Sequence, residues 1–96
     1  MKVELRPYDV AEYLTDRETI FHYLSEELQA NEPPFAARAL SAVIRARGGV
    51  ERLAAETGVS AEVLLHAASA EDQIDHETLE KVIATFREGS ESTRVA

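Results

Sequence analysis

The stretch that decides the fold reads Leu53-Ala54-Ala55-Glu56-Thr57-Gly58-Val59-Ser60 and is followed by Leu64. Two helices that cross at a steep angle need a small residue at their contact and a residue that tolerates a positive φ at the turn. Ala54 supplies the small contact, and Gly58 supplies the turn four residues later. Ser60 is a favoured N-cap for the second helix. The spacing therefore predicts a helix-turn-helix.

Apolar residues around the turn support the same interpretation. Val59 is expected to fill the corner between the two helices, and Leu64 and Ala67 are expected to face the core. The alternative interpretation is an ordinary helix hairpin in which Gly58 is only a C-cap.

Cap and turn residues divide the rest of the chain into further helices. Thr15 and Glu18 form a capping box that predicts the start of a helix ending near Ala30. Pro34 can be the first residue of the next helix, which the Gly48-Gly49 pair ends. Altogether we expect helices over residues 9–14, 15–30, 34–47, 50–57, 60–69 and 75–87.

The last of these helices has the clearest amphipathic pattern. Its apolar residues recur at i, i+3, i+4 and i+7, namely Leu79, Val82, Ile83 and Phe86. The residues after Arg87 are polar and lack such a pattern. We therefore expect one all-α domain of five to six helices over residues 1–87, with a flexible tail over 88–96.

The composition limits the class of protein. The 96 residues are 45% apolar but only 6% aromatic, and they include no cysteine, so the core must hold the fold without disulfides or thiolate zinc sites. No segment resembles a signal peptide or approaches the length of a membrane span. The sequence predicts a cytoplasmic protein with no membrane partner.

The charge distribution is unusual for a DNA reader. The formal net charge is −8, and between Arg52 and Lys81 the chain has no Lys or Arg. Affinity for a duplex comes largely from Lys and Arg that neutralise phosphates. Any contact with DNA must therefore rely on a local basic patch or on the symmetry of a dimer.

Several segments together resemble a known family. They are Tyr8-Asp9-Val10-Ala11-Glu12-Tyr13-Leu14, Ile44-Arg45-Ala46-Arg47-Gly48 and the stretch from Leu53 to Ser60. In this order they resemble the small antidote proteins of bacterial addiction modules, whose helix-turn-helix is similar to that of phage lambda-type repressors. The resemblance spans roughly residues 8 to 86. It implies a lambda-repressor-like domain that neutralises a toxin protein and represses its own operon as a homodimer.

The resemblance also implies which residues face operator DNA. Carried over by position, Ser60 lies at the start of the recognition helix, and the base-facing residues are Ala61, Glu62, Leu65 and His66. The family usually has Arg directly after the capping serine, where this chain has Ala61. Alanine can only touch a thymine methyl group, whereas arginine reads guanine. This departure weakens the prediction of base-specific readout.

Phosphate contacts are expected from the residues just upstream. In repressor-like folds the first helix of the motif crosses the sugar-phosphate backbone, which makes Arg45, Arg47 and Arg52 candidate phosphate ligands. The alternative is that these arginines pair with Glu51, Glu56 and other acids on a solvated face.

A second hypothesis is that the same fold acts as a protein interaction module. Val63, Leu64 and Leu65 are consecutive and cannot all point into one core, so an apolar spot is expected on the surface of this helix. The sequence has no catalytic triad, no phosphate-binding glycine loop and no cluster with metal-ligand spacing. We therefore expect a protein that is not an enzyme and that needs no cofactor or metal.

Overall fold

The helices begin and end close to where the cap and turn residues predict. The computed structural model describes residues 10–70 and 72–95. In chain order these residues form the 3-10 helix η2 (Val10–Tyr13) and the α-helices α1 (Arg17–Ala30), α2 (Pro33–Ala46), α3 (Val50–Thr57), α4 (Ala61–Ser69) and α5 (His76–Val95). The prediction of an all-α domain is confirmed. The Cα radius of gyration of 13.3 Å matches the value of about 13 Å for a compact domain of this length.

Two helix starts differ by one residue from the prediction. Asp16, not Thr15, is the N-cap of α1, and its carboxylate accepts a hydrogen bond from the backbone N–H of Thr19 at 2.8 Å. This hydrogen bond lowers the pKa of Asp16 below its ordinary value. Helix α2 begins at Pro33 and not at Pro34. At each helix start, two adjacent residues suit the same role. Thr15 and Asp16 can both be an N-cap, and Pro33 and Pro34 can both stand in the first turn.

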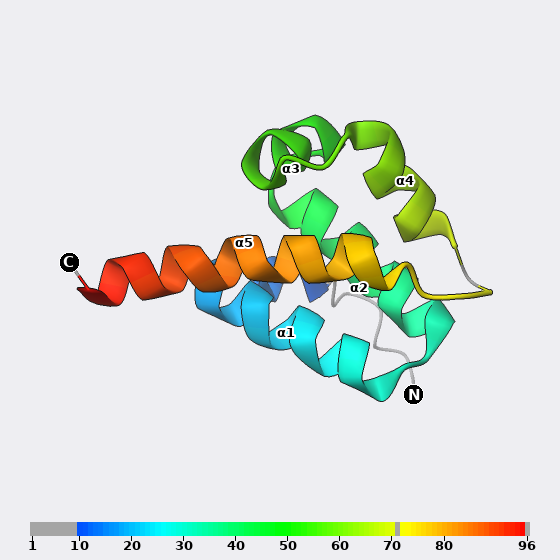
Figure 1. Ribbon diagram of the computed structural model, residues 1–96, viewed down its shortest axis with the longest axis horizontal. Coiled ribbons are helices and arrows are strands. Elements are labelled where there is room, and N and C mark those ends of the chain that lie inside the picture. The colour runs from blue at the N-terminus through cyan, green and yellow to red at the C-terminus, as the bar shows by residue number, and fades with distance from the viewer. Residues whose placement is uncertain (1–9, 71, 96) are drawn as a thin grey trace.

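The core lies between two helix pairs. Helices α1 and α5 pack against each other, and α2 packs against α4 on the other side of the core. Figure 1 shows α5 crossing the front of the molecule, with α1 below it and α3 and α4 above it. The predicted apolar stripe of α5 is buried, since Val82 and Phe86 have no exposed surface and Leu79 and Ile83 are below 10% exposed. The α3–α4 pair therefore packs against α2 and α5.

Helix α5 continues beyond the predicted end. It extends to Val95, eight residues past Arg87, and its last turns project beyond the other helices in Figure 1. The flexibility of residues 88–96 stays a prediction. Within the described residues, no helix combines the length and the hydropathy that a membrane span requires.

Candidate functional site

The turn between α3 and α4 is built by three neighbouring residues. Gly58 has φ 80° and ψ 3°, in the left-handed region, and its N–H donates to the carbonyl of Ala54 at 2.9 Å. The Thr57 hydroxyl donates to the Leu53 carbonyl at 2.9 Å and accepts from the N–H of Val59 at 3.1 Å. These bonds satisfy the backbone groups that α3 leaves unpaired at its end. The sequence pattern predicted Gly58 as the turn residue but did not predict the two hydrogen bonds of the Thr57 hydroxyl.

The second helix of the pair starts as predicted. Ser60 is the N-cap of α4, and its hydroxyl accepts from the N–H of Val63 at 3.2 Å. Leu53 and Leu64 are fully buried, and Val59 and Ala67 are below 10% exposed. The predicted corner residue and the predicted core-facing residues of α4 are therefore confirmed. The tight turn and the buried residues on both sides of it fix α4 on the body of the protein.

The opposite side of α4 faces solvent. Among the residues expected to face bases, Ser60, Glu62, Leu65 and His66 are exposed, and Ala61 is half-buried. Val63 is 42% exposed and Leu65 is 51% exposed, so two of the three consecutive apolar residues point outward. This side of α4 therefore has one acid, one histidine and apolar side chains, and it has no Lys or Arg.

Arg47 is tied to the interior of the domain. Its Nε donates to Oε1 of Glu56 at 3.0 Å, and its second guanidinium nitrogen donates to Oε2 of the same carboxylate. The guanidinium also lies 5.5 Å from the centre of the Phe86 ring. The hydrogen bonds from Arg47 lower the pKa of Glu56, although burial opposes them, and the same bonds raise the pKa of Arg47. Arg47 thus connects α2, α3 and α5.

Two arginines lie over the ring of Phe86. Its ring is fully buried, and the guanidinium of Arg17 lies 5.0 Å from the ring centre. Arg17 also donates to the carbonyl of Thr85 at 3.2 Å. A cation over an aromatic face is attracted by the ring quadrupole, and more strongly when water is excluded. Sequence analysis missed this cluster, because the contacts join residues far apart in the chain.

Arg45 and Arg52, the other two predicted phosphate ligands, are exposed. Arg45 donates to the hydroxyl of Ser41 at 3.4 Å, one turn earlier on α2. Arg52 lies over the corner between α2 and α3, since a Cβ on Gly48 would meet its Cδ at 3.0 Å. These two side chains lie at the end of α2 and the start of α3, and the charge of Arg52 contributes to the lowered pKa of Glu56.

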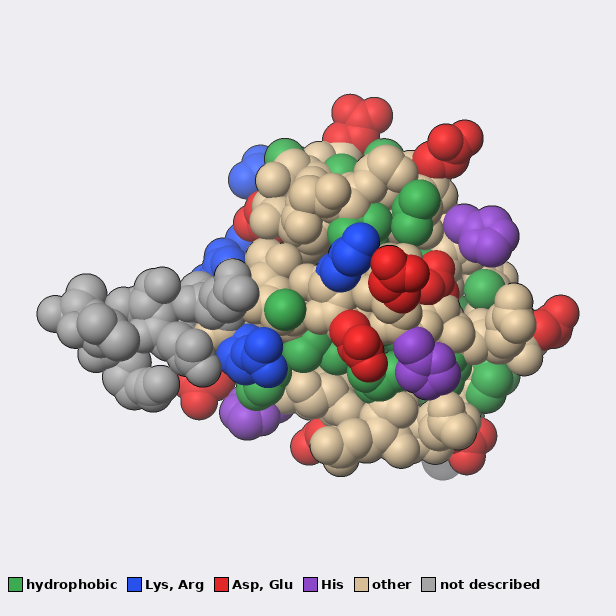
Figure 2. Space-filling model, viewed as in Figure 1, with side chains coloured by type: hydrophobic (Ala, Val, Ile, Leu, Met, Phe, Trp, Pro, Cys, Tyr) green, Lys and Arg blue, Asp and Glu red, His purple; other side chains and the backbone are tan. Residues whose placement is uncertain are grey.

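Charged side chains on the visible face are interspersed. Figure 2 shows Asp and Glu side chains projecting over the α3–α4 pair and beside α5, and the Lys and Arg side chains on this face do not form a patch. His22 lies 3.8 Å from Glu18, one turn away on α1. Among the described residues, no three His, Asp or Glu side chains come together as metal ligands could.

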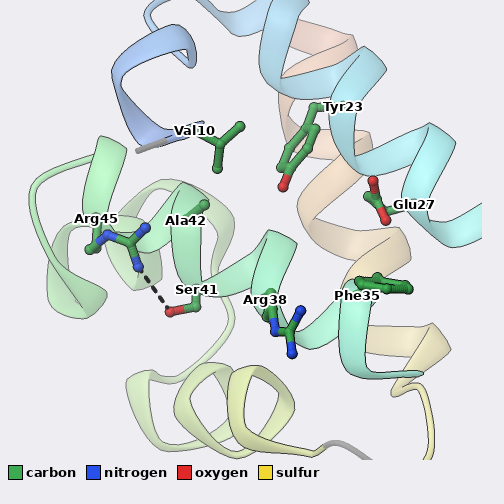
Figure 3. A pocket seen from close by; sticks show the side chains of 8 residues that line it. All are labelled: Val10, Tyr23, Glu27, Phe35, Arg38, Ser41, Ala42 and Arg45. Carbon is green, nitrogen blue, oxygen red and sulfur yellow. Dashed lines mark hydrogen bonds between the residues drawn. The ribbon is translucent and has the colours of Figure 1, made fainter. Parts of the chain in front are cut away.

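A groove opens between η2, α1 and α2. It has a volume of about 350 Å³, and its lining residues are Val10, Tyr23, Glu27, Phe35, Arg38, Ser41, Ala42 and Arg45. Figure 3 shows Tyr23 and Glu27 extending from α1 on one side and Arg38 and Ser41 extending from α2 on the other. Phe35, at the start of α2, is 49% exposed although its neighbours Ala36 and Ala37 are buried. Sequence analysis did not find this groove.

Comparisons with known proteins agree with the resemblance seen in the sequence. The chain matches the model of a protein family described as probable addiction module antidote protein over residues 4–91, which include η2, α1 to α4 and most of α5. It is 36% identical over 83 residues to an uncharacterized protein of Haemophilus influenzae, and the match covers 86% of this chain and 84% of that protein. No solved structure matches the chain significantly.

Proposed function

Because this chain belongs to the family of probable addiction module antidote proteins, we propose that it neutralises a toxin protein and represses its own operon as a DNA-binding homodimer. Membership in an antidote family implies a toxin partner, and such antidotes are typically not enzymes.

The observation that carries the DNA proposal is the construction of the α3–α4 pair. The turn at Gly58 and the cap at Ser60 fix α4 with Leu64 in the core and His66 in solvent. A recognition helix needs this combination of a buried side that holds it and an exposed side that enters the major groove. We therefore assign α3 and α4 as a helix-turn-helix, with α4 as the recognition helix.

The exposed side of α4 limits which bases it can read. Glu62 can accept a hydrogen bond from the amino group of cytosine, and Ala61 and Leu65 can contact thymine methyl groups. Ser60 and His66 can each donate or accept one hydrogen bond. We therefore expect weak discrimination between operators, because no arginine is present to bind guanine through two hydrogen bonds.

Contacts to phosphates are proposed for Arg45 and Arg52. Both are exposed and lie at the end of α2 and the start of α3. Arg47 was predicted to share this role, but its guanidinium is paired with Glu56 and stacked on Phe86. Its proposed role is to position α3 against α5, and Arg45 and Arg52 are the proposed phosphate ligands.

Fluorescence anisotropy with a labelled duplex from the protein's own promoter tests the DNA proposal. A scrambled duplex of the same length should compete for binding less well than the unlabelled promoter duplex, and by a small margin because the discrimination is weak. Exchanging Leu65 for serine should lower the preference for the promoter sequence while the affinity for the scrambled duplex stays the same. Equal affinity of the native protein for both duplexes would show that α4 does not read bases.

A second candidate function is binding of a protein through α4 alone. It is favoured by the exposure of Val63 and Leu65, because adjacent apolar side chains on a surface helix suit the groove of a partner protein. Growth assays with the product of the neighbouring reading frame distinguish the two candidates. If α4 binds the toxin, the substitution Leu65→Ser abolishes rescue of growth. If α4 binds DNA, rescue persists and only repression is weakened.

A further inference from the structure

The groove between η2, α1 and α2 has the residue types of a protein interface. Aromatic side chains and arginine are enriched at the centres of interfaces and dominate their binding energy. The groove combines Tyr23 and Phe35 with Arg38 around Val10 and the buried Ala42. The whole chain is strongly acidic, with a net charge of −8. This combination of residue types is typical of a surface to which a protein binds.

The two sides of the groove carry opposite charges. Glu27 comes from α1 and Arg38 comes from α2, and Figure 3 shows them on opposite sides of the groove. Tyr23 extends from α1, as Glu27 does, and its pKa is raised first by burial and then by the charge of Glu27, whereas the charge of Arg45 lowers it. The charge of Glu27 therefore acts inside the groove.

A surface with both charges around an apolar centre can bind a copy of itself. In an interface with two-fold symmetry, if residue i of one copy contacts residue j of the other, then residue j of the first copy also contacts residue i of the second. The surface must therefore be complementary to itself. Because Glu27 and Arg38 lie on opposite sides of the groove, a two-fold axis that runs midway between them can bring Glu27 of each copy to Arg38 of the other. Phe35 lines the same groove and is 49% exposed, so it is available for contact with a second copy.

We propose that this groove is the homodimer interface, with reciprocal pairs between Glu27 and Arg38 around an aromatic centre formed by Tyr23 and Phe35. The inference deepens the proposed function, which requires a dimer, and it names the surface that forms it. Arg45 also lines the groove, at the end of α2, and its charge acts on Tyr23, but the proposed reciprocal pairs are those of Glu27 and Arg38.

Sedimentation equilibrium of the full chain without DNA tests the proposal. The native protein should dimerise, and the single substitutions Arg38→Glu and Glu27→Arg should each raise the dimer dissociation constant about a hundredfold, because each one creates two like-charge contacts across the axis. A mixture of the two variants should regain native dimerisation, because a dimer with one copy of each variant again has two opposite-charge contacts.

A second groove supplies matched controls. It lies between α1 and α5, and it is lined by Glu80 and Arg87, which are both exposed. The substitutions Glu80→Arg and Arg87→Glu change the net charge as the test substitutions do and should leave the dimer unchanged. Circular dichroism of each variant confirms that it is folded.

Four outcomes would overturn the proposal. They are a native protein that stays monomeric, test variants that still dimerise, a mixture that does not recover, and control variants that dissociate as strongly as the test variants. The test is independent of the proposed function. A dimer with the predicted pattern supports this interface even if the promoter duplex does not bind, and binding of the duplex by a monomer would reject the interface alone.

Discussion

The pair between Arg47 and Glu56 should stabilise the fold measurably. Their side chains are 23% and 28% exposed, and two hydrogen bonds join them. An exposed pair contributes about 0–1 kcal/mol, and breaking a buried pair costs about 3–5 kcal/mol. The Arg47 pair lies between these limits but keeps contact with solvent. We therefore expect a coupling free energy of about 1–2 kcal/mol.

A double-mutant cycle measures this coupling. The substitutions Arg47→Met and Glu56→Gln remove the charges and keep side chains of similar length, so that contact with Phe86 is largely retained. Urea unfolding of the native protein, both single variants and the double variant gives the four free energies of unfolding. We expect the double variant to be about as stable as either single variant, since each substitution alone already breaks the pair.

The exposed pair between Lys81 and Glu77 on α5 is the control. Its atoms are 3.6 Å apart, but the side chains are 60% and 82% exposed, and such pairs contribute about 0.3–0.5 kcal/mol. If the losses of unfolding free energy caused by Arg47→Met and Glu56→Gln add up to that of the double variant within about 0.5 kcal/mol, the two residues are not coupled, because independent sites give additive changes.

Three further predictions follow from the same contacts. The pKa of Glu56 is lower in the folded state than in the unfolded state, where it is about 4.3. The pair with Arg47 therefore provides its full stabilisation above the unfolded pKa. This stabilisation is lost as the pH falls through the folded pKa. Urea unfolding at a series of pH values should show a smaller acid-induced loss of stability in the Glu56→Gln variant, and an unchanged loss would contradict this assignment. The substitution Gly58→Ala should lower the free energy of unfolding by about 1–2 kcal/mol. The cause is the left-handed backbone alone, because the added Cβ meets no atom within 4 Å. An unchanged free energy in urea unfolding would show that alanine is not strained at this position. In promoter titrations, Arg52→Ala should make the salt dependence less steep by about 2 units of log–log slope, because a dimer loses two phosphate contacts, whereas Arg47→Met should not change the slope.

The sequence predicted the parts of the fold that depend on neighbouring residues. Gly58 has the positive φ expected of it, and Ser60 accepts the capping hydrogen bond from Val63. Such features can be read from a sequence because the backbone conformation and the hydrogen bond both lie within a few residues. Leu64 was assigned to the core for the same reason, since its place on the helix follows from the cap.

Contacts between distant residues could not be predicted in this way. Arg47 has several acids within reach along the chain, and only the packing of α3 against α5 selects Glu56 as its partner and Phe86 as its ring. The groove between η2, α1 and α2 also depends on how three elements meet. Phe35 is apolar and lies on a helix with a buried side, yet it is exposed at the edge of this groove.

The dependence of promoter binding on salt concentration decides whether Arg45 and Arg52 bind DNA phosphates. With Arg45 and Arg52 of two protomers on four phosphates, the logarithm of the association constant should fall against the logarithm of the salt concentration with a slope of about −3.6. A slope near zero, or no binding at about 50 mM salt, would contradict the assignment of α3 and α4 as a DNA-binding helix-turn-helix.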